Sequence, residues 1–388
     1  MSTLKVGALQ GISASSDAIT LANDGTCTAK LTDNGGNQFA NRNKIINGEF
    51  RVNQRNHSGS ASHNSYTLDR WKYARSANTE FSTSQSTDTP DGFANSVKLD
   101  CISANGSTGA GDYAYFRYHI EGQDLQELNK GTSAAKVATL SFYVKCDITG
   151  TFAINVIDEN NRMCNVTYTV SDTNWNRYIV TIPADTSGAI ANTNATGLSI
   201  HFYIIAGSSI NSGGSLNSWG TYNTGYLAQG HTANIVSTNH NWYMTGVQLE
   251  ISDYATPFEH RSFAQELALC QRYFYNHVDG SVDGSSGANT VSSNGTFYTS
   301  TNIIASIQFP VQMRTKPTVE VATGTNFYGT FFNGGSLNKF TGSSTSLDGI
   351  SNRNQAVIGN SDASGSGGGA ALWRTDNTGA KISFSAEL

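Results

Sequence analysis

The fold is indicated first by Asn47-Gly48-Glu49-Phe50, which is followed by Asp69-Arg70-Trp71, and by Trp242-Tyr243-Met244-Thr245-Gly246-Val247-Gln248-Leu249-Glu250 far along the chain. Between these segments lie short β-type runs separated by Gly, Asn, Ser and Thr. Many short strands with turn signals between them are typical of a β-sandwich or jelly roll. We therefore predict that the first and last segments, near Phe50 and Val247, pair and close one sandwich.

Alternation within the central runs supports this interpretation. In Leu198-Ser199-Ile200-His201-Phe202, the three apolar residues share one face of a strand, and His201 falls on the polar face. The fold class that follows is mainly β. It comprises an N-terminal β arm over residues 1–40, a jelly-roll β-sandwich over 41–260, one amphipathic linking helix over 261–276 and a smaller C-terminal β domain over 277–388.

The N-terminal arm contains a short apolar run, Leu4 to Leu9, and a turn signal, Asn23-Asp24-Gly25, between two β-type runs. It is too short to bury a core of its own. We expect an ordered anchoring or oligomerisation arm that needs a partner, either another copy or a different protein. The alternative is a frayed terminus.

The linking helix has a start signal and an apolar stripe. Ser262, with Gln265 three residues later, matches a capping box. The stripe that we predict consists of Phe263, Leu267, Cys270 and Phe274. Such a helix beside β domains is expected to pack against one or both of them.

Composition and charge exclude several classes of protein. The chain has 388 residues, of which 38% are hydrophobic and 14% charged, with a net charge of −5. A stripe of Lys and Arg is missing, so we expect no nucleic-acid partner. No apolar run approaches the roughly 20 residues of a membrane helix, so we expect no membrane insertion. The five cysteines are widely spaced without a CxxC pair, which favours buried, reduced thiols over a zinc site.

The first residues, Met1 to Val6, lack the apolar core of a signal peptide. We therefore expect synthesis and folding in a reducing host cytoplasm. The protein would leave the cell by lysis, as part of a particle.

Several short motifs are spread over most of the chain. They are Asn47 to Phe50, Thr67 to Trp71, His119 to Gly122, Leu140 to Lys145, Thr245 to Glu250, Thr256 to Arg261, Leu267 to Phe274, Met313 to Pro317 and Ser385 to Leu388. On these motifs the chain resembles tail-fibre and related virion structural proteins of tailed bacteriophages, of the marine-phage type, with a jelly-roll domain like those of carbohydrate-binding modules. The resemblance implies a location in the virion and a homotrimer, and it leaves open which part of the particle the protein occupies.

Glycan binding is the first chemistry that we predict, because saccharides stack on aromatic rings and accept hydrogen bonds from polar side chains. The candidate residues are Trp219, Tyr222 and Tyr226, in a loop rich in Gly, Ser and Asn. The alternative is that these rings pack into the sandwich or a subunit interface.

The second chemistry that we predict is the binding of a structural calcium ion. The resemblance to carbohydrate-binding modules implies a calcium site between the first and last strands, where Glu49 and Glu250 would supply oxygen ligands. A dense Asp/Glu loop is missing, however, and the alternative is a pair of ordinary carboxylates. We therefore expect no cofactor apart from this calcium candidate.

Catalysis is not expected. The eight histidines are scattered, and neither an HExxH nor a GxSxG motif occurs. The regular rung repeat of a β-helical depolymerase is also missing.

Two arginines in the matched motifs are expected to serve the fold. Arg70 and Arg272 each stand beside an aromatic residue, which favours cation–π stacking or a carboxylate pair, with Glu121 and Asp69 as partners.

The function that we predict is adhesion without catalysis. The protein would be a short tail fibre or receptor-binding appendage that binds host-surface glycans and is anchored to another virion protein through residues 1–40. The alternatives are a capsid decoration or head-fibre protein anchored by the same arm, and a glycan depolymerase.

Overall fold

The computed structural model describes residues 41–388 apart from 77–79, 105–106, 239, 282–290 and 333–335, together with three short strands of the N-terminal arm. These strands form an antiparallel sheet in the order β1-β2-β3. Their bounds are Ala8–Leu9, Ile19–Leu21 and Cys27–Ala29. The predicted turn at 23–25 lies outside the described residues.

The main domain is a sandwich of two antiparallel sheets. The six-stranded sheet has the order β13-β10-β16-β8-β7-β4. Its strands, in chain order, are β4 (Ser58–Ser60), β7 (Glu80–Ser86), β8 (Ser96–Ser103), β10 (Ala138–Cys146), β13 (Asn176–Ile182) and β16 (Asn241–Glu250).

The seven-stranded sheet has the order β15-β12-β11-β14-β9-β6-β5. Its strands are β5 (Ser65–Tyr66), β6 (Trp71–Arg75), β9 (Tyr113–Glu121), β11 (Gly150–Asp158), β12 (Arg162–Val170), β14 (Thr196–Ala206) and β15 (Trp219–Thr221). Two 3-10 helices, η1 (Gly122–Leu128) and η2 (Thr224–Tyr226), lie in its connections. The predicted fold class, a mainly β chain with a jelly-roll sandwich, is confirmed.

An aromatic cluster fills the space between the sheets. The ring of Trp71 is stacked on Phe116 with centroids 5.1 Å apart, and Phe50 lies 5.0 Å from Trp71. The Nε1 atom of Trp71 donates to the carbonyl of Asn47 over 3.1 Å. Burial of these large rings is the main source of stability for the sandwich.

The segments around Phe50 and Val247 lie side by side, as predicted. The amide of Val247 donates to the carbonyl of Gly48 over 3.0 Å, and the amide of Lys44 donates to the carbonyl of Leu249 over 3.0 Å. A Cβ atom on Gly48 would lie 2.2 Å from the carbonyl oxygen of Val247. Glycine is therefore required where the first segment meets β16.

Replacing Gly48 by alanine should lower the free energy of unfolding by about 1–3 kcal/mol, because the backbone must move to relieve the clash. Chemical denaturation followed by circular dichroism measures this loss. Gly111→Ala is the matched control, since a Cβ there meets nothing within 4 Å. Equal stability of the two variants would contradict the proposed contact.

The linking helix α1 spans Phe263–Gln271, and its capping box between Ser262 and Gln265 is present. The predicted range 261–276 was too long, because Phe274 begins the next strand. The predicted stripe is wrong in part: Cys270 is buried, but 47% of Phe263 is exposed.

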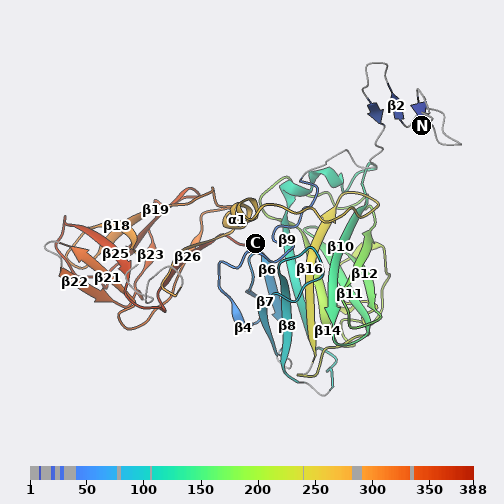
Figure 1. Ribbon diagram of the computed structural model, residues 1–388, viewed down its shortest axis with the longest axis horizontal. Helices are drawn as coiled ribbons and strands as arrows, with labels where there is room; N and C mark the ends of the chain where they lie inside the picture. The colour runs from blue at the N-terminus through green and yellow to red at the C-terminus, as the bar shows by residue number, and fades with distance from the viewer. Residues whose placement is uncertain are drawn as a thin grey trace, which may run out of the picture.

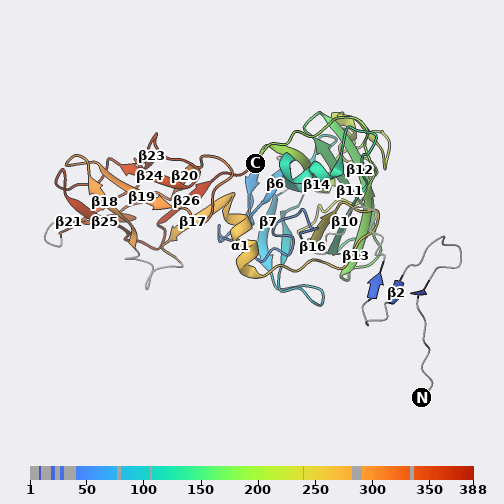
Figure 2. The ribbon, with the colours of Figure 1, turned by 90° about the horizontal axis from the view of Figure 1, so that it is seen from above.

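The C-terminal domain contains two further antiparallel sheets, in the orders β17-β26-β20 and β22-β21-β25-β18-β19-β24-β23. The strands are β17 (Phe274–Asp279), β18 (Val291–Phe297), β19 (Ile303–Gln308), β20 (Thr318–Val321), β21 (Tyr328–Phe332), β22 (Ser336–Phe340), β23 (Ser346–Leu347), β24 (Gln355–Asn360), β25 (Ala370–Thr375) and β26 (Lys381–Ser385). Helix α1 lies between this domain and the sandwich, and the C-terminus returns to the junction (Figures 1 and 2).

Polar contacts hold the two domains together at this junction. Arg272 makes two hydrogen bonds to the carboxylate of Glu121, of 2.9 and 2.8 Å. Arg314 donates to the carbonyls of Asn194, over 2.9 Å, and of Ala386, over 2.7 Å. The C-terminal segment is therefore part of the interface between the domains.

Two expectations about the described residues can be compared directly. Cys101, Cys146, Cys164 and Cys270 are free and buried, as expected. No helix in the described part of the chain combines the length and the apolar character needed to cross a bilayer.

Candidate functional site

The outer face of the seven-stranded sheet carries polar and aromatic side chains. Strand β9 alternates, so that Phe116 and its apolar neighbours point into the core while Tyr113, Tyr115, Arg117 and His119 point outward. We call this surface the outer face.

A row of polar residues crosses the outer face from strand to strand. The register pairs Lys72 with Arg117, Arg117 with His201, His201 with Asn155, and Asn155 with Asn165. Residues in register on one face of a sheet are neighbours, with Cβ atoms about 4.5–5.5 Å apart. The row therefore gathers five side chains from β6, β9, β14, β11 and β12, which are far apart in the sequence.

Some polar atoms of this row have no hydrogen-bond partner among the described residues. They are Nδ1 of His201, Oδ1 of Asn155 and Nε of Arg117. Only 7% of His201 and 0% of Asn155 is exposed. Leaving a buried polar atom unsatisfied costs about 1–3 kcal/mol, so a water molecule or a polar ligand group next to these atoms would be stabilising.

The row carries positive charge at one end and is neutral in the middle. Burial lowers the pKa of His201 to about 3, and Arg117 contributes to the same shift. Burial also lowers the pKa of His119 to about 2, and this ring hydrogen-bonds the hydroxyl of Ser199 over 2.7 Å. Both imidazoles are thus uncharged at neutral pH, and the positive charge belongs to Lys72 and Arg117.

Tyrosine rings lie beside the row. The ring of Tyr115 is parallel to His201, with an angle of 2° and centroids 4.7 Å apart, and it is stacked with Tyr113 at 5.6 Å. Burial raises the pKa of Tyr115, Arg117 opposes the shift, and the nearby Tyr113 and Tyr222 add to it. Tyr222 is 37% exposed, so it extends the aromatic surface toward solvent.

The segment 207–231 brings Tyr222 to this face. The amide of Gly207 donates to the carbonyl of Asp112 over 2.7 Å, which ties the start of the segment to β9. The amide nitrogen Nδ2 of Asn165 donates to the carbonyl of Tyr226 over 2.8 Å, which ties its middle to β12. The segment therefore packs over part of the outer face and buries the Asn155 end of the row.

The three glycan-binding candidates do not form one platform. Trp219 is half-buried at the edge of the core: it pairs with Cys164 and donates from Nε1 to the carbonyl of Pro183 over 2.8 Å. Lys130 lies 4.5 Å above its ring. Tyr222 lies at the outer face, and the ring of Tyr226 lies next to Gly214. A glycan-binding role for each stays a prediction.

Sequence reasoning placed His201 on a polar face but missed Lys72, Tyr115, Arg117 and Asn155. For Tyr115 and Arg117 the available signal was the alternation of β9, in which every second side chain is buried. The register between strands is needed to bring them together.

The two calcium candidates have protein partners. Oε2 of Glu49 lies 3.1 Å from Nδ1 of His260, and burial raises the pKa of Glu49 although His260 opposes the shift. Glu250 lies 3.3 Å from Nε of Arg42 and accepts from the amide of Thr256 over 3.0 Å. In the described part of the chain, no group of three His, Cys, Asp or Glu side chains could hold a metal ion.

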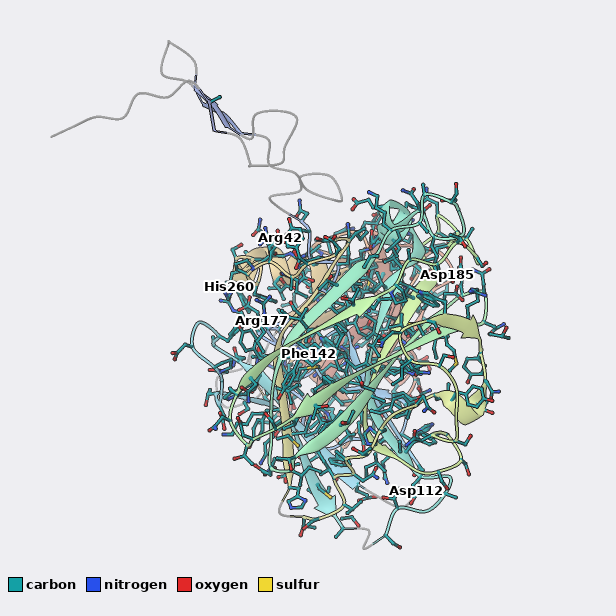
Figure 3. All side chains as sticks on the ribbon, turned by 90° about the vertical axis from the view of Figure 1, so that its right-hand side faces the viewer. Arg42, Asp112, Phe142, Arg177, Asp185 and His260 are labelled. Atoms are coloured by element: carbon teal, nitrogen blue, oxygen red, sulfur yellow. The ribbon has the colours of Figure 1, made fainter. Side chains whose placement is uncertain are left out.

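Figure 3 shows where these partners lie. Arg42 and His260 are at one end of the sandwich, and Asp112, which adjoins Tyr113 of the outer face, is at the other. The partners of the calcium candidates thus lie at the opposite end of the sandwich from Asp112.

We predict that removing calcium leaves the thermal midpoint unchanged, because His260 already contacts Glu49, and Arg42 and Thr256 already contact Glu250. Melting with and without a calcium chelator measures this. A fall of several degrees on chelation would instead support a calcium ion at Glu49 and Glu250.

No protein-family model matches the chain, and no curated protein matches it. Some solved structures are similar in part. One is the enzymatically active domain of tailspike protein 4 of bacteriophage CBA120, with 13% identity and a TM-score of 0.30. The match covers 54% of this chain and 21% of that chain, so this chain spans about a fifth of its length.

Carbohydrate-binding modules are also similar. The C-terminal family 22 module of Clostridium thermocellum Xyn10B has 11% identity and a TM-score of 0.31, over 56% of this chain and 100% of that chain. A family 11 module from Clostridium thermocellum, in complex with a β-1,3-1,4-mixed-linked tetrasaccharide, has 12% identity and a TM-score of 0.27. The match covers 53% of this chain and 99% of that chain. At these values the likeness supports no functional inference.

Proposed function

We propose that this chain is a non-catalytic bacteriophage virion protein that adheres to host-surface glycans through the outer face. The observation that carries the proposal is the polar row of Lys72, Arg117 and His201, next to the rings of Tyr115 and Tyr222. A saccharide presents hydroxyls around its edge and C–H groups on its faces. It can satisfy the row and cover the rings at the same time.

The virion part of the proposal rests on the sequence motifs. The resemblance to tail-fibre proteins of tailed phages, of the marine-phage type, covers most of the chain and implies a homotrimer. In a trimer, three weak glycan contacts would act together and give useful avidity. We propose a short tail fibre or receptor-binding appendage, with residues 1–40 bound to another virion protein. A capsid decoration protein anchored by the same arm is the alternative.

The absence of catalysis is supported by the partners of the buried carboxylates. Glu121 is held by Arg272, Asp158 by Lys130 and Glu250 by Arg42. Carboxylates engaged in this way are not positioned as the acid and base of glycoside hydrolysis. A depolymerase would release reducing ends from host glycan, and we expect none in a reducing-end assay.

Binding to glycan extracted from host cells tests the proposal. Tyr115→Ala should weaken binding about two- to tenfold, since one aromatic contact is worth about 0.5–1.5 kcal/mol. Tyr254→Ala is the matched control, because Tyr254 is a 48% exposed tyrosine between β16 and α1. Equal binding by both variants and the parent chain would reject the outer face.

Trp219→Ala separates the outer face from the predicted loop site. Because Trp219 packs at the edge of the core, we expect the variant to melt at a lower temperature and to keep its glycan affinity once folded. A loss of affinity without a loss of stability would place the sugar on Trp219 instead.

A further inference from the structure

We propose that the glycan bound at the outer face is acidic, and that Lys72 and Arg117 bind its carboxylate or sulfate groups. This inference rests on the proposed function and adds the chemical class of the ligand. Its basis is the arrangement of charge on the outer face.

Two cations stand directly opposite each other on neighbouring strands. Lys72 of β6 is in register with Arg117 of β9. Like charges in this position destabilise a sheet. Among the described residues, neither side chain forms an ion pair with a carboxylate: Lys72 lies 5.0 Å above the ring of Tyr66, and Arg117 donates to Oδ1 of Asn64. A bound anion would remove the repulsion.

The surroundings do not neutralise this pair. The carboxylate that interacts electrostatically with Lys72 is that of Glu387. It is held by Arg70 at 2.5 Å and by Arg55 at 3.2 Å. The neighbouring imidazoles, His119 and His201, are uncharged. The two cations are therefore available to an external anion.

The order of the row determines how an acidic oligosaccharide would lie. Its anionic group would meet Lys72 and Arg117, and a neighbouring hydroxyl would lie toward His201, which is 7% exposed. Strands are about 4.8 Å apart, so the row from Lys72 to His201 extends about 10 Å. This length suits a short run of linked sugars. The edge of the Tyr115 ring, which is stacked against His201 and Tyr113, would lie beside the sugar.

The overall negative charge of the chain opposes the binding of an acidic glycan. The chain carries a net charge of −5, so a polyanion is repelled by the protein as a whole at long range. Attraction must then come from the local pair, and removing that pair should abolish it.

Matched polymers provide the test. Polygalacturonate is compared with carboxyl-reduced polygalacturonate, and dextran sulfate with dextran, using the full chain. We expect at least tenfold tighter binding of one acidic polymer than of its neutral counterpart. The two pairs separate a carboxylate ligand from a sulfate ligand, and either preference supports the proposal.

Variants connect the preference to the outer face. Lys72→Gln/Arg117→Gln should lose the preference for the acidic polymer and keep the melting midpoint at or above that of the parent, because a repulsive contact is removed. Lys316→Gln is the control, since Lys316 is an exposed lysine of the C-terminal domain whose Nζ donates to the carbonyl of Gly349. It should bind like the parent.

The outcomes that overturn the inference differ from those that overturn the proposed function. If acidic and neutral polymers bind equally and Tyr115→Ala weakens both, the ligand is not acidic but the glycan site remains. If the double variant keeps the acidic preference, the anion binds elsewhere and the inference fails. If neither these polymers nor host glycan binds, the proposed function fails as well.

Discussion

Replacing Arg70 by alanine is expected to lower the free energy of unfolding by about 3–5 kcal/mol, the usual loss when one partner of a buried ion pair is removed. Only 1% of the Arg70 side chain is exposed, and its Nη1 atom lies 2.5 Å from Oε2 of Glu387. Its guanidinium carbon lies 3.4 Å above the ring of Tyr273 and 5.1 Å from that of Tyr118. The change would remove an ion pair and two stacking contacts together.

The loss should appear at the junction of the domains as well as in the sandwich. Arg70 precedes β6, whereas Tyr273 and Glu387 belong to the C-terminal part of the chain. We therefore expect proteolysis near α1 to become faster in Arg70→Ala. Chemical denaturation measures the free energy of unfolding, and limited proteolysis measures the loosening of the contact between the two domains.

A double-mutant cycle isolates the charge. Arg70→Ala leaves Glu387, whose side chain is 4% exposed, with Arg55 as its remaining cation. Adding Glu387→Gln removes the carboxylate that has lost Arg70, so the double variant should lose less stability than the two single losses added together. Lys316→Ala, at an exposed site, should change stability by less than about 0.5 kcal/mol. A loss below about 1 kcal/mol for Arg70→Ala would show that this pair does not hold the junction.

Arg70 and Arg272 show which contacts could be predicted from the sequence and which could not. An arginine beside an aromatic predicted cation–π stacking, and this is confirmed for Arg70; the expected pair of Arg272 with Glu121 is confirmed too. The expected partner Asp69 is wrong for Arg70, because the carboxylate it meets is Glu387. The pairing of β26 with β17 brings the C-terminal segment to this junction, and local patterns carry no information about that contact.

The helix illustrates the same limit. Its start was predictable, because a capping box is a local device. Its end was not: Phe274 has the right spacing for the apolar stripe, but it pairs with Ser385 in β26. Tertiary pairing ends α1 at Gln271, where periodicity would let the helix continue.

For the outer face, alternation is visible in each strand but the neighbours are not. His201 was placed correctly on a polar face, and the sequence offered no reason to set it between Arg117 and Asn155. Register decides this, and a shift by one residue would exchange the outer and inner faces.

Replacing Lys130 by methionine is the second change with a large expected effect, again about 3–5 kcal/mol. The Lys130 side chain is 4% exposed and its Nζ lies 2.5 Å from Asp158 and 2.9 Å from Asp185. It also donates to the carbonyls of Ser187 and Gly188, both over 3.0 Å. Without it, Asp158 loses its ion-pair partner inside the protein.

The loss should depend on pH. Burial alone would raise the pKa of Asp185, but hydrogen bonds from Arg162 and Lys130 outweigh burial and lower it. A carboxyl whose pKa is lower in the folded state contributes stability above its unfolded pKa, about 3.9, and loses it as the pH falls through the folded pKa. The parent chain has more of this contribution to lose than Lys130→Met, so the difference between them should narrow below about pH 4.

A surface pair provides the control. Lys98 and Asp100 are 3.1 Å apart with side chains 28% and 35% exposed, so Lys98→Met should cost less than about 1 kcal/mol. Denaturation of the parent and both variants from pH 7 to pH 3 makes the comparison. If the deficit of Lys130→Met is the same at every pH, the loss comes from packing of the lysine stem beneath Trp219 and not from charge, because packing energy does not titrate.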